Sequence, residues 1–581
     1  MRHAVMTEYQ QWIASRGGAC WPSGGDQFLW VATDRQRSAL LSRAEAVLWQ
    51  MALPFQPRAA LIAAAQERQS MPSAVATAAL VRLEAMDLVV TPAVMIGDAE
   101  LRPPAPAPVI AVRTYRRPQA LARLLDSALD RRQRGDVSRP WLVVDDARTD
   151  VDAADNVDVV ARAARAGLDV MYLGPVQRRE MLATLPETAD PRIACLLDPA
   201  VLATASGARS WNWAMLLTAG ATVSMIDDDC FLPVRRPPAW QRHWSMQNAS
   251  ATEGRFFDGA MPDLPEMDED PWREALTVLG QSPGALAQRD GLLIRQIAGQ
   301  SHEQLSSWRA GRRVAAVIAG IHGGHVFNSA LYLNITDSHS LRDLLREPFV
   351  LDRLQGDHLW QGVSVPRLTS SAVYTPFLID NRELVPLTPT AGHADDTAFL
   401  GLLSAIAPDS SFAMLPMLMG HAPVEHRDRL DAMFRELLVD GNTYLSGFAH
   451  HASPQLRGRD RAARLQAIAA MAANAGACSD AEWQADVAVW RNRVIAGALD
   501  ALAQSVKLAA GEAPAEWLHA VARADAVNRA AMSTPAPADL LAGSRRCFAQ
   551  LAHGAAAWTH WWTTAAAGWA DEWRQRLRLR A

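Results

Sequence analysis

The chain has 581 residues, more than one hydrophobic core usually serves, and its length therefore predicts about three domains. Hydrophobic residues make up 49% of the sequence and charged residues 20%, with a net charge of -5, which excludes a largely disordered chain and a general binder of nucleic acid. The five cysteines show no CxxC spacing and no apolar run reaches about 18 residues, so zinc, disulfides and a membrane span are not indicated and a cytoplasmic location is expected.

The first hundred residues predict a small domain in which strands are followed by helices. Apolar segments at 28–31 and 38–41 have the length and composition of strands. Helical periodicity then recurs three times, near residues 44–48, 61–65 and 75–83. A β-ribbon followed by three helices is a winged-helix-like arrangement, which we assign to residues 1–101.

This order of elements resembles the PqqD-like domain, a peptide recognition element found on enzymes that modify ribosomally made peptides. The segment from Leu80 to Val90 is similar to the closing pattern L..L...GLV of that family, although Asp87 stands where glycine is frequent. The resemblance implies that a leader peptide adds as a strand to the exposed edge of the ribbon. Two other interpretations stay open: a domain that only packs against its neighbour, and a DNA-binding winged helix, which the lack of a dense arginine face weakens.

A proline-rich segment at 102–108 predicts an extended linker, and alternating strands and helices follow it. Three apolar runs are typical of buried strands, at 109–112, 141–144 and 170–173. The alternation predicts an α/β fold with a mostly parallel, Rossmann-like sheet whose ligand site lies at the carboxyl ends of the strands. Asp145 and Asp146 directly follow the second of these strands.

Three consecutive aspartates, Asp227, Asp228 and Asp229, follow the apolar run at 221–226. Three like charges within about 7 Å repel one another in a low-dielectric site unless a divalent cation or a hydrogen-bond network holds them. Carboxylate oxygens favour Mg²⁺ or Mn²⁺. Side chains alternate along an extended segment, so Asp227 and Asp229 are expected on one side and Asp228 on the other. An acidic turn after a strand is the alternative interpretation.

Five segments in the same order resemble the GT-A nucleotide-sugar glycosyltransferases of the large inverting family. They are an opening strand and turn at 109–118, a first helix at 124–127, a segment at 143–150 similar to VVDDGSTD, a helix start at 207–214 similar in part to G.ARN.G, and the three aspartates in the D-x-D position. Ala147 and Arg148 replace the usual Gly-Ser, and the glycine after Asn212 is missing. The resemblance implies a GT-A catalytic domain over residues 109–425.

The same resemblance implies which residues bind a nucleoside-diphosphate sugar. The nucleoside would contact Thr114, Asp145 and Asp146, because a carboxylate accepts hydrogen bonds from base N–H groups and ribose hydroxyls. Arg209, at the start of a helix whose free N–H groups attract anions, would meet the diphosphate. Two alternatives stay open, Asp146 as a helix cap and Arg209 as a surface arginine.

By resemblance, the metal ion is Mn²⁺ or Mg²⁺ and Asp229 is its main ligand. Asp227 faces the sugar nucleotide and can share the metal, which bridges the two phosphates and stabilises the departing nucleoside diphosphate. His421 follows the run at 415–420 and has the chain position of an additional metal ligand in several GT-A families. A lone histidine beside an apolar run is also commonly a core or loop residue.

A second acidic pair, Asp395 and Asp396, precedes the helical pattern at 399–403. Carboxylates are favoured in the first turn of a helix, so capping alone can explain them. The pair also resembles the ED motif of inverting GT-A enzymes, with Asp395 in place of Glu and Asp396 in the position of the catalytic base. Inverting transfer needs one carboxylate to deprotonate the attacking hydroxyl. The Glu-to-Asp change leaves the choice between the two neighbours open.

Residues 426–581 are rich in Ala, Leu, Arg and Trp, and their periodicity predicts a C-terminal helical domain with a buried tryptophan face. The expected activity is metal-dependent transfer of a hexose from a nucleoside-diphosphate sugar to an acceptor hydroxyl, with a leader-bearing peptide as a candidate partner. Two competing interpretations are a non-catalytic peptide-binding scaffold with a degenerate GT-A domain, and a nucleotidyltransferase, which would release pyrophosphate.

Overall fold

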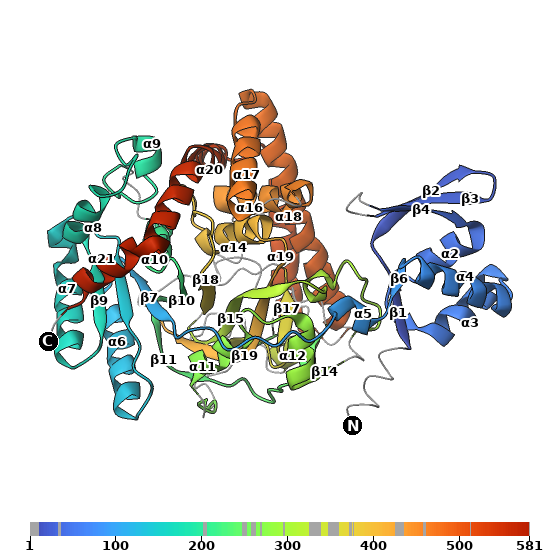
Figure 1. Cartoon of the computed structure of the whole chain (residues 1–581), viewed down its shortest axis with the longest axis horizontal. Helices are drawn as coiled ribbons and strands as arrows, with labels where there is room; N and C mark the ends of the chain where they lie inside the picture. The colour runs from blue at the N-terminus through green and yellow to red at the C-terminus, as the bar shows by residue number, and fades with distance from the viewer. Residues whose placement is uncertain are drawn as a thin grey trace.

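The protein combines a large, mostly parallel β-sheet with many helices, and a smaller N-terminal unit lies beside this body (Figure 1). The computed structural model describes residues 11–32, 37–201, 206–246, 253–256, 263–267, 270–293, 297–324, 338–346, 359–370, 375, 377–423, 435–437, 439–456, 460–509, 511 and 513–579. The domain boundary predicted between residues 425 and 426 lies outside these residues. We call residues 11–96 the N-terminal unit and residues 109–579 the body.

The N-terminal unit contains two small sheets and a group of helices. Its strands are β1 (Trp12–Ser15), β2 (Gly18–Gly24), β3 (Gln27–Ala32), β4 (Ser38–Ser42), β5 (Gln56–Pro57) and β6 (Val89–Val90). They form an antiparallel ribbon of order β2-β3-β4 and a second sheet of order β5-β1-β6. The helices are α2 (Arg43–Met51), α3 (Arg58–Gln69), α4 (Ser73–Ala85) and α5 (Pro92–Ile96).

Local sequence signals explain most of this unit. The side chain of Ser42 accepts a hydrogen bond from the backbone N–H of Glu45, and the Glu45 carboxylate accepts one from the backbone N–H of Ser42, so a capping box starts α2. The predicted strands correspond to β3 and β4, and the three predicted helices to α2, α3 and α4. Strand β2 was not predicted, because glycine and proline in its sequence GACWPSG are rare within strands.

The predicted linker is extended and lies against the body. The backbone N–H of Arg102 donates to Gln281 Oε1 over 3.0 Å, and Gln281 Nε2 donates to the Arg102 carbonyl over 2.7 Å. Further along, the backbone N–H of Ala105 donates to the carbonyl of Leu276 over 3.2 Å. The linker is therefore held at its start and in its middle by side-chain and backbone contacts.

In the described part of the chain, the body is built on a 13-stranded sheet whose main path has the order β14-β12-β17-β19-β15-β18-β10-β7-β8-β9. The strands on this path are β7 (Val109–Thr114), β8 (Trp141–Asp145), β9 (Val170–Leu173), β10 (Ala221–Asp227), β12 (Trp244–Ser245), β14 (Leu292–Leu293), β15 (Arg313–Gly323), β17 (Arg367–Thr369), β18 (Leu378–Asn381) and β19 (Ser410–His421). Three more pair beside it: β11 (Cys230–Arg235), β13 (Glu253–Phe256) and β16 (Leu359–Gly362). Strands β9, β8, β7 and β10 are parallel neighbours, and β18 joins β10 in the antiparallel direction.

Helices cover both faces of this sheet. Successive side chains of a strand point to opposite faces, so the apolar strands need a covering layer on each side. Val109 and Ala111 of β7 belong to one core cluster, whereas Ile110 and Val112 belong to the other. The second cluster includes side chains of α6 (Pro118–Gln133), α7 (Asp150–Arg165), α11 (Pro271–Val278) and α12 (Pro283–Asp290). The first includes side chains of α8 (Pro175–Leu182), α9 (Pro191–Ala194), α10 (Gly207–Leu217), α13 (Ser338–Leu344) and α14 (Asp395–Ile406).

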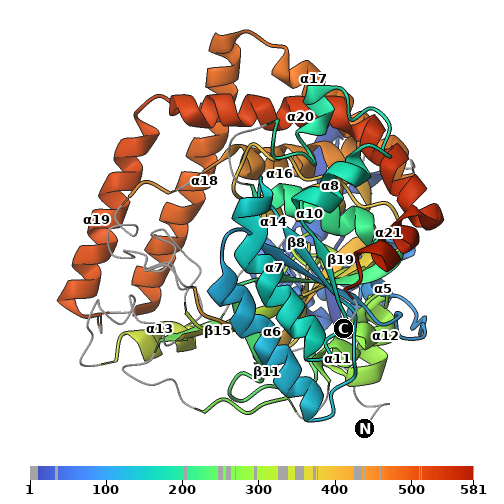
Figure 2. The ribbon, with the colours of Figure 1, turned by 90° about the vertical axis from the view of Figure 1, so that its left-hand side faces the viewer.

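The C-terminal helices share that first core with the sheet. They are α16 (Gly441–Ala452), α17 (Arg461–Gly476), α18 (Asp480–Ala509), α19 (Ala515–Met532), α20 (Ala538–Thr564) and α21 (Ala570–Leu577), and α20 lies across α16 and α17 (Figure 2). The predicted tryptophan face is buried: the indole N–H of Trp558 donates to the Val385 carbonyl and that of Trp562 to Asn381 Oδ1. Among the described residues, no helix has the length and apolar character needed to cross a membrane.

Candidate functional site

A cavity of about 450 Å³ opens where the strand order of the sheet reverses. Strand β7 has β8 on one side and β10 on the other, and in open α/β sheets such a switch point is the usual place for a ligand. The cavity lies at the carboxyl ends of both β7 and β10. It is lined by Arg113, Thr114, Tyr115, Arg117, Asp146, Ser206, Gly207, Ser210, Asp227, Asp228, Asp229, His393, Asp395 and His421.

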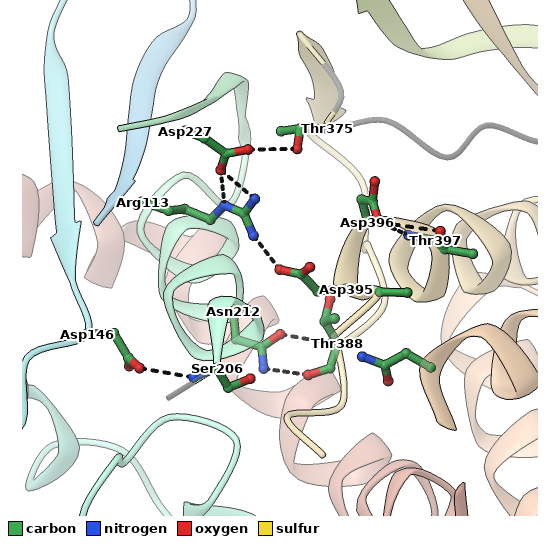
Figure 3. Close-up of polar contacts among 12 residues, drawn as sticks. Arg113, Asp146, Ser206, Asn212, Asp227, Thr375, Thr388, Asp395, Asp396 and Thr397 are labelled. Carbon is green, nitrogen blue, oxygen red and sulfur yellow. Dashed lines mark hydrogen bonds and ion pairs between the residues drawn. The ribbon is translucent and has the colours of Figure 1, made fainter. Parts of the chain in front are cut away.

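Arg113 bridges two carboxylates that lie far apart in the sequence (Figure 3). Its Nε and Nη2 donate to Asp227 Oδ1 over 2.9 and 2.5 Å, and its Nη1 donates to Asp395 Oδ2. The guanidinium also lies 4.9 Å from the ring centre of Trp211. Burial alone would lower the pKa of Arg113, but the two carboxylates outweigh it and raise that pKa. One arginine therefore joins β7, β10 and α14 at the cavity wall.

Gly207 makes room for this bridge. A Cβ atom at this position would lie 2.7 Å from Asp395 Oδ2 and 3.0 Å from Arg113 Nη1. We expect Gly207→Ala to lower the free energy of unfolding by about 1–2 kcal/mol, because the overpacked ion pair outweighs the better helix propensity of alanine. Urea denaturation measures the change. The matched control is Gly497→Ala in α18, where a Cβ meets nothing within 4 Å, and an equal response of the two variants would contradict the steric explanation.

The three consecutive aspartates all line the cavity, which corrects the orientation predicted for Asp228. Asp227 is the last residue of β10, and the chain turns over the next two residues, so the alternation of an extended segment no longer applies. Thr114 Oγ1 donates to Asp228 Oδ2 over 2.7 Å. Arg117 Nη1 lies 3.4 Å from Asp228 Oδ1 and 3.6 Å from Asp229 Oδ2. Arg117 therefore compensates part of the negative charge for which the sequence suggested a divalent cation.

His421, the last residue of β19, faces Asp229 across the cavity. Its Nε2 lies 3.4 Å from Asp229 Oδ1, and its Nδ1 lies 2.8 Å from the Gly324 carbonyl oxygen. The backbone N–H of Ala422 donates to the Asp229 carbonyl over 2.8 Å, which fixes the two segments together. Burial alone would lower the pKa of His421, but the Asp229 carboxylate raises it.

These contacts decide how well a metal ion fits. An imidazole nitrogen and a carboxylate oxygen that face each other, with the other ring nitrogen held by a carbonyl, form a donor pair suited to a metal that takes further ligands from phosphate and water. Asp227 does not fit this pair as arranged, because its Oδ1 accepts from Arg113 and its Oδ2 accepts from Thr375 over 3.1 Å. Among the described residues, no three His, Cys, Asp or Glu side chains gather closely enough to hold a metal by themselves.

Asp146 lines the cavity, but the structure places Asp145 and Arg209 behind the cavity wall. Arg209 is fully buried, and its Nε and Nη2 donate to the two oxygens of Asp146 over 3.0 and 2.8 Å. Helix α10 is buried almost throughout, so a charged side chain in its first turn needs a counter-charge within the core. Asp145 accepts hydrogen bonds from Asn156, Tyr172 and the backbone of Ala147, and burial raises its pKa.

Asp395 and Asp396 form the first turn of α14, but only Asp395 lines the cavity. Asp396 is half-buried and accepts a hydrogen bond from the backbone N–H of Thr397 over 2.7 Å (Figure 3). Burial and the neighbouring charge of Asp395 raise the pKa of Asp396 to about 7. Burial also raises the pKa of Asp395, although Arg113 acts in the opposite direction. Asp396 can therefore gain or lose a proton near neutral pH.

Arg113 and Arg117, which lie among these carboxylates, were not predicted from the sequence as site residues. Arg113 is in direct register with Asp227 across the parallel pair β7–β10. A charged residue as the penultimate member of a buried apolar strand is the signal that could have identified it, since buried charges are nearly always paired. Comparisons of the chain with protein-family models, curated proteins and solved structures found no match. Its function is therefore inferred from the geometry and charge of the cavity.

Proposed function

We propose that the protein is a metal-dependent glycosyltransferase that moves a hexose from a nucleoside-diphosphate sugar to an acceptor hydroxyl. The supporting observation is the convergence of Asp229, Asp395 and His421 on one cavity, although the three residues come from segments far apart in the sequence. That cavity lies at the switch point of a mostly parallel sheet, where nucleotides bind in other α/β folds.

In this proposal, Asp229 and His421 hold a Mn²⁺ or Mg²⁺ ion between them. When bound, the metal acts as a Lewis acid that stabilises negative charge on the diphosphate. Arg117 lies beside the same carboxylates, where its guanidinium can bind phosphate oxygens. Asp227 accepts a hydrogen bond from Arg113 and so holds that side chain in place. It also lines the cavity, on the side that would face the sugar.

The nucleoside is proposed to bind at the side of the cavity formed by Thr114 and Asp146. Both residues line it, and Thr114 ends the strand β7 whose carboxyl end opens into the site. Asp145 and Arg209 act behind them: Arg209 holds the Asp146 carboxylate in place, and Asp145 fixes the loop after β8 through its contact with the Ala147 N–H.

The acidic pair at α14 is proposed to supply the general base. A carboxylate is an effective base at neutral pH when its pKa lies near the working pH, and the pKa of Asp396 meets that condition at about 7. Asp395 lines the cavity, but its Oδ2 accepts a hydrogen bond from Arg113 Nη1 and is engaged in the Arg113 bridge. We therefore assign the base to Asp396 and a positioning role to Asp395.

The N-terminal unit is proposed to recognise a peptide that carries the acceptor. Trp21, Leu29 and Leu40 stand directly opposite one another across β2, β3 and β4, and each is more than a third exposed. Among the described residues β2 pairs only with β3, so its other edge can accept a further strand. An apolar row beside an open edge suits an extended peptide, which gains backbone hydrogen bonds and side-chain contacts together.

One observation favours the alternative of a non-catalytic scaffold. Both oxygens of Asp227 already accept hydrogen bonds from protein side chains, and Arg209 is buried in the core. Two residues that the resemblance assigned to binding the sugar nucleotide therefore make contacts within the protein instead. A scaffold would bind peptide at the N-terminal unit but would bind no nucleotide sugar.

Calorimetric titration of UDP-, GDP- and dTDP-sugars with and without Mn²⁺ tests the proposal. We expect one donor to bind only when Mn²⁺ is present. Asp229→Asn should weaken that binding by roughly tenfold or more, since it replaces the charged carboxylate that would bind the metal by a neutral amide. Asp158→Asn, an exposed aspartate on α7, is the matched control and should bind as the wild type does. Absence of donor binding under every condition would support the scaffold.

A further inference from the structure

A second, larger cavity of about 720 Å³ lies between the N-terminal unit and the body. The start of β2, the end of β3 and the residues just before β4 form its wall on one side, represented by Gly17, Trp30 and Arg37. On the other side it is lined by residues of the segment 302–312 and by the end of α16. Because antiparallel strands bring these ends together, the cavity lies at one end of the ribbon β2-β3-β4.

This cavity is rich in arginine although the chain as a whole is acidic. Its lining includes Arg16, Arg37, Arg309 and Arg312, against the carboxylates of Glu303 and Asp409. Arg16 and Arg37 share one further carboxylate outside the lining, that of Asp87, over 2.7 and 2.9 Å. Arg309 also pairs with Glu303 over 3.1 Å. With Asp87 included, four arginines face three carboxylates, so the local charge is still positive and can attract an anion.

Two buried rings line this cavity, Trp30 on the side of the ribbon and His302 on the side of the body. Trp30 is only 1% exposed, and its indole N–H makes no hydrogen bond within the part of the chain that the structure describes. This nitrogen has almost no exposed surface, so an occupant of the cavity does not reach it. Burial and the charge of Arg309 lower the pKa of His302 to about 3, so this histidine is neutral and leaves the arginines as the charged groups.

We propose that this cavity binds an acidic segment of a peptide chain. A peptide strand added at the β2 edge runs toward the cavity, because β2 starts there, and its carboxylates would then meet arginines in the forked geometry that suits them. The inference rests on the proposed function only in taking a peptide as the partner, since the binding requires no sugar transfer.

Fluorescence anisotropy of the full chain with labelled synthetic peptides tests this inference. The probe is a short peptide of alternating Glu and Ser, and its matched control has Gln in place of Glu. We expect the Glu peptide to bind and the Gln peptide to bind at least tenfold more weakly. Arg309→Gln and Arg312→Gln should each weaken binding of the Glu peptide by roughly tenfold. Arg309→Lys should retain part of the affinity, and Arg529→Gln on α19 should change nothing, with circular dichroism confirming that each variant is folded.

Three results would overturn the inference. One is equal binding of the Glu and Gln peptides, another is unchanged binding in both folded arginine variants, and the third is full displacement of the probe by citrate at an equal carboxylate concentration, which would indicate a site for a small polyanion. Donor calorimetry on the same preparations separates this inference from the proposed function. Peptide binding without donor binding would remove only the transferase, whereas donor binding without peptide binding would remove only this site.

Discussion

Replacing Arg113 by methionine is expected to lower the free energy of unfolding by about 3 kcal/mol. Breaking a buried ion pair by removing one partner typically costs about 3–5 kcal/mol, because the remaining charge stays buried without compensation. Here two carboxylates lose their partner, but the Asp227 side chain is 35% exposed and water screens part of its charge, which places the loss at the lower end. Methionine keeps the volume of the side chain, so the change reports mainly on charge.

Urea denaturation measures this loss, and Arg162→Met provides the matched control. Arg162 is exposed on α7, where loss of the charge should change stability by less than about 0.5 kcal/mol. In the double variant Arg113→Met/Asp395→Asn, the second substitution should recover part of the loss, because one of the two uncompensated charges is gone. A single variant as stable as the control, or a double variant that loses the sum of both changes, would show that the bridge does not stabilise the fold.

Asp396→Asn is expected to lower the rate of sugar transfer by about 10²–10⁴-fold while leaving donor binding unchanged. A positioned general base contributes about this much, and asparagine keeps the shape of the side chain but cannot accept the proton. Single-turnover kinetics with the donor identified by calorimetry measures the rate. Asp395→Asn is the natural comparison, because it is the neighbouring carboxylate. Transfer that survives in Asp396→Asn but is lost in Asp395→Asn would move the base to Asp395.

The pH dependence of the wild type gives a second readout of the same group. The base acts only when ionised, so the rate should rise with pH through about 7 and level off above it, and Asp396→Asn should lose this rise. Stability should change in the opposite direction. The folded chain keeps the proton of Asp396 between about pH 4 and 7 whereas the unfolded chain releases it, so the free energy of unfolding contributed by this group falls as pH rises through that range. A wild-type rate that does not rise with pH near 7 would contradict the assignment of Asp396 as the general base.

Sequence patterns were sufficient for the strands that carry the site. Buried apolar runs that alternate with helices predicted β7, β8 and β9 as parallel strands with the ligand side at their carboxyl ends, and the apolar run before the three aspartates predicted β10; these four strands lie together. The cavity accordingly contains Thr114, Asp146 and the three aspartates. The resemblance also predicted that Asp395, Asp396 and His421 belong to the same site as Asp229. Asp395 and His421 line the cavity, whereas Asp396 does not.

Contacts that depend on register could not be read from the sequence. Arg113 meets Asp227 only because β7 and β10 pair with these residues side by side, and a shift of one residue would point Arg113 to the other face. Asp228 turned toward the cavity because the chain leaves the strand after Asp227. Arg209 carried the pattern of an anion-binding helix start, yet the burial of α10 decides its contact with Asp146. In each case a tertiary contact overrides the local signal.

The core that joins the sheet to the C-terminal helices has a consequence for how the chain folds during synthesis. The N-terminal unit has a hydrophobic cluster of its own, from Ile13 to Val89, and can collapse soon after it leaves the ribosome. Val109 of the first sheet strand, in contrast, shares its cluster with Trp561 and Leu577. One face of the sheet therefore stays open to water until nearly the whole polypeptide has been translated, and this interval is when the body depends most on protection from aggregation.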